Sequence, residues 1–167
     1  MTDQPQPTHL EIEYLYLDLS HCTRCQDTRA ELLKAIDLAR PTLAALGAKI
    51  TLRETHVTTA TQAREAGFTL SPTIRINGRD IQPARHMSEC QECGDLCNCQ
   101  GGLSCREWEA GGTSHLAPPP ELILAAIFGE LAQTSPAQPP SENITEVERF
   151  FAAPSQQPNC CAPGCCG

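Results

Sequence analysis

Apolar residues near the N-terminus follow first the spacing of a strand and then that of a helix. Tyr, Leu and Ile dominate residues 11–19, a run too short for a typical helix, and this predicts a buried strand. After Cys22 the apolar positions recur every three or four residues, which predicts an amphipathic helix. Pro41 is expected to kink or briefly break this helix, and Gly47 to end it. The predicted buried face comprises Leu32, Leu33, Ile36, Ala39 and Leu43.

The next segment predicts a second strand, a short helix and a hairpin. Apolar and polar residues alternate in the stretch AKITLRETHV, as in a half-buried strand. Thr59 and Gln62 have the spacing of a capping box, so a short helix begins there. Residues 73–76 form a β-branched, alternating strand. Asn77 and Gly78 then favour a tight type I′ turn into an antiparallel partner strand.

The order of these elements predicts an α/β domain with a four-stranded mixed sheet flanked by helices on both faces. Two prolines open a closing helix over residues 119–131. We expect one domain over residues 10–131, with the cysteine-rich residues 83–118 as an irregular insertion. Residues 132–167 are expected to form a flexible linker and a disordered cysteine-rich tail, interrupted by a short helix in ITEVERFFAAP.

Charge and hydropathy argue against several kinds of partner. The formal net charge of −8 argues against nucleic acid and anionic membrane surfaces as main partners. No apolar run approaches the length needed to span a bilayer. The polar, acidic N-terminus lacks the basic start of a secretory signal. We therefore expect a cytoplasmic protein.

The cysteine content is unusual for such a protein, because cytosolic cysteines more often serve metal binding or catalysis than a disulfide framework. There are eleven cysteines, in three groups that differ in spacing. Cys22 and Cys25 form a Cys-x-x-Cys pair where the first predicted helix begins. There, unpaired backbone N–H groups, together with His21 and Arg24, would stabilise a thiolate on Cys22. The pair is interpreted as a redox or soft-ion dithiol, with half of a zinc site completed by the central cysteines, or a structural pair, as alternatives.

The central group, CQECGDLCNCQGGLSC, has few aliphatic residues and needs another source of order. A structural zinc ion held by four cysteines is the preferred interpretation. Disulfides, free thiols or an iron–sulfur cluster are the alternatives. The preferred ligands are Cys90, Cys93, Cys97 and Cys105, with Cys99 as the spare.

The terminal group, CCAPGCC, places two pairs of adjacent thiols on a segment too polar to build a core. Thiolates favour soft ions such as Zn(II) and Cu(I), and by the same chemistry Hg(II) or As(III). A merely exposed cysteine tail is the alternative. The predicted ion-capture residues are Cys160, Cys161, Cys165 and Cys166.

The dithiol position, the proline before an alternating strand and the Asn-Gly hairpin together resemble the thioredoxin superfamily, especially over GFTLSPTIRINGRDI. Within it, the CTRC and CGDLC segments are similar to those of short prokaryotic thioredoxin-like proteins of unassigned function. The resemblance implies a thioredoxin-like fold, a cis Pro72 beside the dithiol, Cys22 as nucleophile and Cys25 as resolving thiol. Thr23 and Arg24 replace the Gly-Pro usual between thioredoxin cysteines, so a general thioredoxin role does not follow.

These features predict a thiol protein that handles or detoxifies thiophilic metals or metalloids, such as mercury or arsenic. A reducing thiol system would be its second partner. The alternatives are a thiol–disulfide oxidoreductase for a protein partner and a non-enzymatic metallochaperone or metal store.

Overall fold

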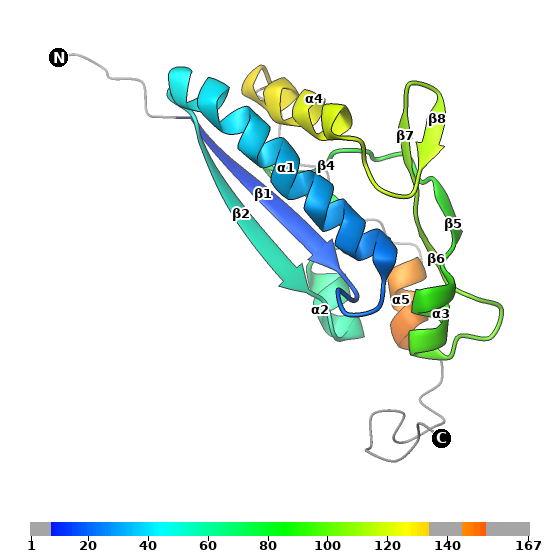
Figure 1. Cartoon of the computed structure of the whole chain (residues 1–167). Coiled ribbons are helices and arrows are strands. Elements are labelled where there is room, and N and C mark those ends of the chain that lie inside the picture. Colours follow the sequence, from blue (N-terminus) through cyan, green and yellow to red (C-terminus); the bar gives the residue numbers. More distant parts are fainter. Residues whose placement is uncertain (1–7, 134–144, 153–167) are drawn as a thin grey trace.

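The computed structural model describes residues 8–133 and 145–152. Figure 1 shows the elements in space. The helices are α1 (Thr23–Ala45), α2 (Ala60–Glu65), α3 (Gln91–Cys97), α4 (Pro120–Leu131) and α5 (Glu146–Ala152). The strands are β1 (His9–Tyr16), β2 (Lys49–His56), β3 (Thr73–Ile76), β4 (Arg79–Asp80), β5 (Met87–Glu89), β6 (Ser104–Arg106), β7 (Trp108–Ala110) and β8 (Thr113–His115).

Four strands form one mixed sheet in the order β2-β1-β3-β4. β1 pairs in parallel with β2, from His9 opposite Lys49 to Tyr16 opposite His56. β3 pairs antiparallel with β1 and then with β4. A parallel β1–α1–β2 crossover followed by an antiparallel hairpin produces this order. The expectation of a four-stranded mixed sheet is confirmed.

The main core lies between this sheet and the layer formed by α1 and α4, which run side by side over it (Figure 1). Successive residues of a strand point to opposite faces. The buried Leu10, Ile12 and Tyr14 of β1 therefore share this core with the apolar stripe of α1. Glu13, from the other face of β1, forms ion pairs with Arg53 and Arg75.

On that second face, Arg75 also ties the sheet to α2, as its guanidinium donates to the Ala66 and Gly67 carbonyls where α2 ends. Helices therefore flank both sides of the sheet.

Local signals fixed several boundaries as expected. The Thr59 hydroxyl accepts a hydrogen bond from the backbone N–H of Gln62 and caps α2. Asn77 and Gly78 both have positive φ, at 51° and 78°, between β3 and β4. Pro41 does not interrupt α1, which continues to Ala45. Pro41 lies near the end of α1, and Leu43 beyond it is buried in the main core, which favours the continued helix.

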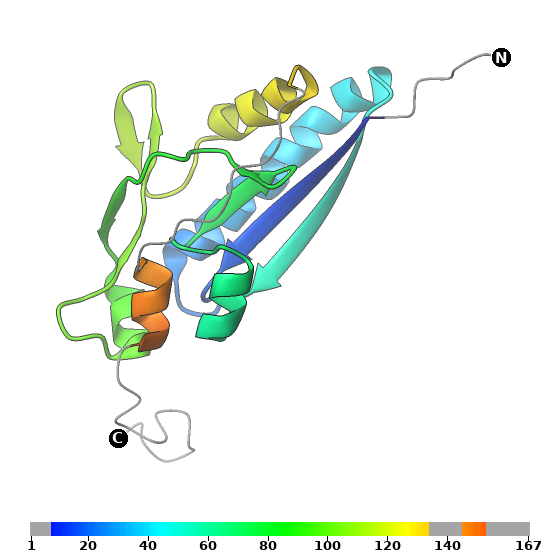
Figure 2. The same cartoon turned by 180° about the vertical axis from the view of Figure 1, so that it is seen from behind.

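Residues 83–118 were expected to be irregular, but they contain one helix and two small antiparallel sheets, β5–β6 and β7–β8. α5, from the range expected as linker and tail, packs against α2 and α3 (Figure 2). Val147 of α5 is fully buried, and its N–H donates to the Thr69 carbonyl at 3.3 Å. α5 and the insertion thus cover the end of the sheet where α1 begins.

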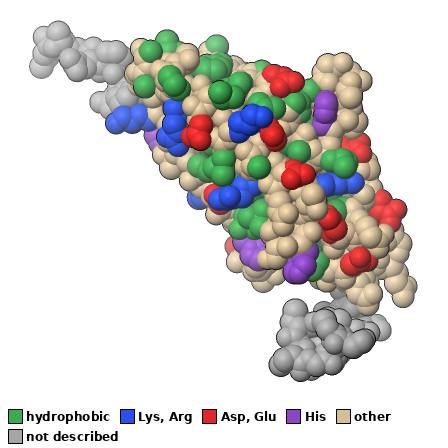
Figure 3. All heavy atoms as spheres, in the orientation of Figure 1, with side chains coloured by type: hydrophobic (Ala, Val, Ile, Leu, Met, Phe, Trp, Pro, Cys, Tyr) green, Lys and Arg blue, Asp and Glu red, His purple; other side chains and the backbone are tan. Residues whose placement is uncertain are grey.

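Basic and acidic side chains are interleaved on the face formed by α1 and α4 (Figure 3). Within the described part of the chain, no helix combines the length and the apolar character needed to cross a membrane.

Candidate metal centre

The start of α1 positions the first two cysteines. Cys22 is the N-cap residue, and its carbonyl accepts the first helical hydrogen bond, from Gln26 N at 3.1 Å. Asp18 Oδ2 accepts from the backbone N–H of His21 at 2.5 Å and of Cys22 at 3.0 Å. Burial would raise the pKa of Asp18, but these two hydrogen bonds hold it below its ordinary value. A carboxylate therefore stabilises the entry into α1.

The insertion brings three further cysteines to the same place. Cys90 is the N-cap residue of α3, and its N–H donates to the Leu103 carbonyl at 2.8 Å. Cys93 follows in the first turn of that helix. Cys105 lies on β6, opposite Ser88 of β5. The two Cys-x-x-Cys motifs therefore meet, each opening a helix.

Three sulfurs form the compact centre of this arrangement. The Sγ atoms of Cys22, Cys90 and Cys93 all lie within 4.8 Å of one another. Cys105 lies beside them, close enough for its thiol to interact with each of the three. None of these cysteines is in a disulfide, nor is Cys25. All five are buried, the most accessible being Cys90 at 3%. We call Cys22, Cys90, Cys93 and Cys105 the sulfur cluster.

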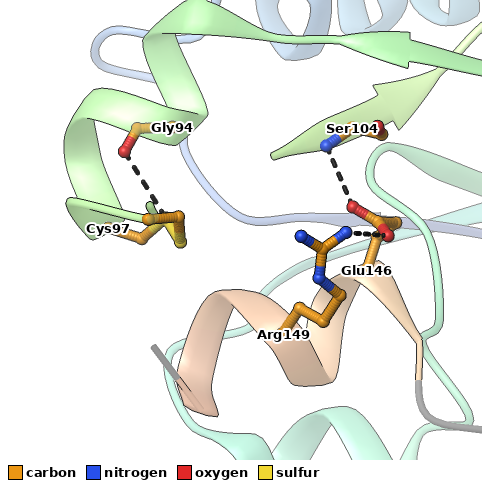
Figure 4. The surroundings of a disulfide bond; sticks show 6 residues. Gly94, Cys97, Ser104, Glu146 and Arg149 are labelled. Carbon is orange, nitrogen blue, oxygen red and sulfur yellow. Dashed lines mark hydrogen bonds and ion pairs between the residues drawn. A yellow bond between two sulfur atoms is a disulfide. The ribbon is translucent and has the colours of Figure 1, made fainter. Parts of the chain in front are cut away.

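Cys97 was predicted as a ligand, but the structure places it in a disulfide with Cys99. Cys97 is the last residue of α3, and the left-handed Asn98 (φ 49°) turns the chain sharply after it. This turn brings the two Cα atoms to 5.2 Å. In Figure 4 Cys97 lies by the carbonyl of Gly94, with its sulfur 3.5 Å from that oxygen. The structure thus brings together three of the four predicted central ligands and adds Cys22.

Hydrogen bonds between thiols dominate the protonation of the cluster. Those from Cys105, and then from Cys25, Cys90 and Cys93, lower the pKa of Cys22 despite its burial. The hydrogen bond with Cys22 and burial raise the pKa of Cys25. A hydrogen bond from Cys105 is the main cause that brings the pKa of Cys90 down to about 7. Negative charge in the cluster is therefore favoured at Cys22 and Cys90.

The pKa of the remaining two cluster thiols moves the other way. Hydrogen bonds with Cys105, Cys22 and Cys90 raise the pKa of Cys93, and burial adds to this. The hydrogen bond with Cys22 raises that of Cys105. The protonated form is therefore favoured at Cys93 and Cys105.

The basic residues next to Cys22 act differently from expectation. The Arg24 guanidinium donates to the main-chain carbonyls of Ser88, Glu89 and Cys105, at 2.6–3.3 Å. His21 is exposed and lies 3.6 Å from the Asp18 carboxylate. The low pKa of Cys22 thus follows from the neighbouring thiols rather than from His21 and Arg24.

The residues between Cys22 and Cys25 attach α1 to the insertion. The Thr23 hydroxyl and backbone N–H donate to the two Glu92 oxygens, at 2.6 and 3.0 Å. Glu92, which lies in the first turn of α3, thus binds the first turn of α1. Its distance from Thr23 in the chain leaves no local signal for this contact.

Cys25 faces a different neighbour. Its Sγ lies 3.6 Å from the hydroxyl of Ser71, and its carbonyl accepts from the buried Tyr14 hydroxyl at 2.6 Å. The Ser71–Pro72 peptide bond is cis, as the resemblance implied. Cys25 therefore contacts Ser71 and Tyr14 and is not part of the three-sulfur centre.

Arg106, next to Cys105, was not identified from sequence. Its backbone N–H donates to the Ser71 carbonyl at 2.7 Å. Its buried guanidinium donates to the carbonyls of Pro72 and Gln82, at 2.9 and 2.8 Å, and to Asp80 Oδ2 at 2.7 Å. It therefore fixes β6 and Cys105 to the segment around Pro72.

α5 contacts the insertion on its outer side. Glu146 accepts from the backbone N–H of Ser104 at 2.9 Å and from Arg149 at 2.6 Å, as Figure 4 shows. Val147 belongs to the same buried group of side chains as the sulfur cluster. The predicted tail ligands, Cys160, Cys161, Cys165 and Cys166, lie outside the described residues.

Comparison with known proteins gives a family without an assigned activity. Residues 10–127 match the family described as a domain of unknown function, DUF2703. No curated protein and no solved structure matches the chain. The match spans the sheet, the dithiol and the entire insertion. The chain therefore belongs to the DUF2703 family.

Proposed function

We propose that this protein binds a soft metal or metalloid ion through the sulfur cluster and takes part in handling or detoxifying such ions in the cytoplasm. The grouping of Cys22, Cys90 and Cys93 within 4.8 Å, buried and not in disulfides, is the observation that carries the proposal. A metal–sulfur bond of about 2.3 Å in a tetrahedral site places sulfurs about 3.8 Å apart. The three sulfurs are therefore close to the spacing that a bound ion requires.

The surroundings support ion binding over a simple buried thiol core. Four polarisable sulfur atoms gather where two helices begin, and thiolates prefer soft ions. Hydrogen bonds through Thr23, Arg24 and Arg106 hold the segments together around them. Bound zinc is one form of such a site. Mercury and arsenic are the detoxification targets proposed from its chemistry.

The C-terminal cysteines are proposed as a capture site that passes ions to the cluster. α5 ends at Ala152, so Cys160 follows eight residues after an element packed against the insertion. At about 3.5 Å per residue, this tether reaches up to about 28 Å. A thiol held this close to the cluster has a high effective concentration there.

A thiol–disulfide oxidoreductase is the second candidate. A thioredoxin-like fold is proposed from the parallel β1–β2 pair, the β3–β4 hairpin and the cis Pro72. The lowered pKa of Cys22 and the neighbouring Cys25 of the same Cys-x-x-Cys motif favour thiol–disulfide exchange. Full burial of both sulfurs disfavours it, because a protein disulfide must reach Cys22. A reducing thiol system is the proposed partner in either case.

The experiment compares the full chain with a tail-serine variant, in which Cys160, Cys161, Cys165 and Cys166 are all replaced by serine. Reduced, anaerobic protein is titrated with Hg(II) and As(III), and bound ions are counted. We expect about one tightly bound ion per tail-serine chain and additional capacity in the full chain, since separate thiol groups bind separately.

Two outcomes would count against ion binding by the sulfur cluster as the function, and a third would count against the role of the tail. If the tail-serine variant binds no ion, the cluster is not an ion site. If that variant instead reduces a protein disulfide at the rate of a dedicated oxidoreductase, the second candidate is the better account. If the full chain and the tail-serine variant bind the same number of ions, the tail is not a capture site, and the proposal for the cluster stands.

A further inference from the structure

The net charge of the occupied site distinguishes the classes of ion that the sulfur cluster could hold. Four thiolates around a divalent cation leave two negative charges in a buried site, whereas three thiolates around a trivalent centre leave none. Uncompensated buried charge is strongly unfavourable. The charged groups around the cluster therefore indicate which ion class fits.

Two of the charged groups closest to the cluster in the chain are carboxylates. Asp18 accepts from the N–H of Cys22, and Glu92 accepts from the N–H and hydroxyl of Thr23. These carboxylates occupy N–H groups at the positive end of α1 that would otherwise offset thiolate charge. The contacts of the Arg24 guanidinium are with carbonyl oxygens. Arg24 keeps its positive charge, and Arg106, next to Cys105, is ion-paired with Asp80. Asp18 and Glu92 together outweigh the charge of Arg24, so these surroundings disfavour a dianionic site.

The arrangement of the sulfurs also favours three ligands over four. Cys22, Cys90 and Cys93 form the mutually close set, and Cys105 is not a member of it. Three close sulfurs are the complete ligand set of a trivalent, thiophilic centre. Cys105 is then left outside the ligand set.

Resting on the proposed function, we propose that the ligand class of this site is a trivalent metalloid hydroxide of the arsenite or antimonite type, bound by Cys22, Cys90 and Cys93. Three S–H groups react with three metalloid–OH groups, and a sulfur that starts as a thiolate first takes up one proton from the solvent. Three metalloid–sulfur bonds form, three metalloid–oxygen bonds break, and the thiol protons leave in three water molecules. The oxidation state does not change, so no oxidant or reductant is needed.

The test uses the full-length tail-serine chain, reduced and anaerobic, with sodium arsenite and zinc chloride as separate probes. Cys105→Ser should change arsenite affinity by less than about threefold, whereas Cys93→Ser should lower it by about 100-fold, because one of three tethered ligands is lost. Zinc affinity should fall in both variants. X-ray absorption should count three sulfurs around arsenic with or without the Cys105 thiol.

The results separate the two claims. An equal loss of arsenite affinity in Cys105→Ser and Cys93→Ser, or two sulfurs around arsenic, would overturn the trivalent class. Zinc held by four sulfurs, with no arsenite binding, would overturn it while leaving the proposed function intact. If neither arsenite nor zinc binds, both the trivalent ligand class and the proposed function are wrong. Circular dichroism and thermal unfolding confirm that each variant compared is folded.

Discussion

Cys90→Ser and Cys22→Ser, each in the tail-serine chain, are expected to weaken soft-ion binding by roughly 100- to 1000-fold. Four-ligand zinc sites contribute about 10–16 kcal/mol of apparent binding free energy, or roughly 2.5–4 kcal/mol per ligand. Both sulfurs belong to the three-sulfur centre, one from each Cys-x-x-Cys motif. A similar loss in both variants would show that the motifs form one site. The measurement is competition against a chromophoric chelator.

The matched control replaces Cys97 and Cys99 together by serine. These cysteines lie in the same insertion but pair with each other. We expect their replacement to change affinity by less than about threefold, because ligands outside the site contribute little to binding. An affinity loss in this control as large as that in Cys90→Ser would restore the ligand set first predicted from spacing.

Arg106→Ala is expected to lower the free energy of unfolding of the ion-free protein by about 2–4 kcal/mol, because it leaves the partly buried Asp80 carboxylate and the Pro72 and Gln82 carbonyls without their donor. Burial lowers the pKa of Arg106, and Asp80 opposes that shift. The guanidinium also stacks over Trp108, 5.0 Å from the ring centroid. Urea unfolding followed by Trp108 fluorescence and circular dichroism measures the effect.

Arg40→Ala is the control for this change. Arg40 forms an ion pair with Asp37 on the exposed side of α1, and its side chain is 63% exposed. Its replacement should change stability by less than about 0.5 kcal/mol. If Arg106→Ala is no less stable than Arg40→Ala, the hydrogen bonds around Pro72 do not hold the insertion in place.

Local patterns predicted the elements that build the sheet. The strand-like run before Cys22, the helical spacing after it and the Asn77–Gly78 turn each depend on residues close together in the chain. The structure has β1, α1 and the β3–β4 hairpin at these positions. Periodicity did not reveal the short strands of the insertion, because three-residue strands hold too few positions for a pattern.

The composition of the candidate metal centre depends on contacts between distant segments. Spacing treats Cys97 and Cys105 as equivalent ligands, but the turn at Asn98 directs Cys97 to Cys99. Completion of a half-site at Cys22 by the central cysteines was one open alternative. The structure places Cys22 next to Cys90 and Cys93, as that alternative requires. Nothing local marks Glu92 or Arg106 as the residues that hold the two segments together.

The central claim is that the dithiol and the insertion share one ion. X-ray absorption of stoichiometric zinc bound to the tail-serine chain and to its Cys22→Ser variant tests this most directly. We predict sulfur-only coordination in the tail-serine chain and one sulfur fewer in Cys22→Ser, with an oxygen or nitrogen ligand in its place. An unchanged sulfur count in Cys22→Ser would contradict the account, because the insertion would then hold the ion without the dithiol.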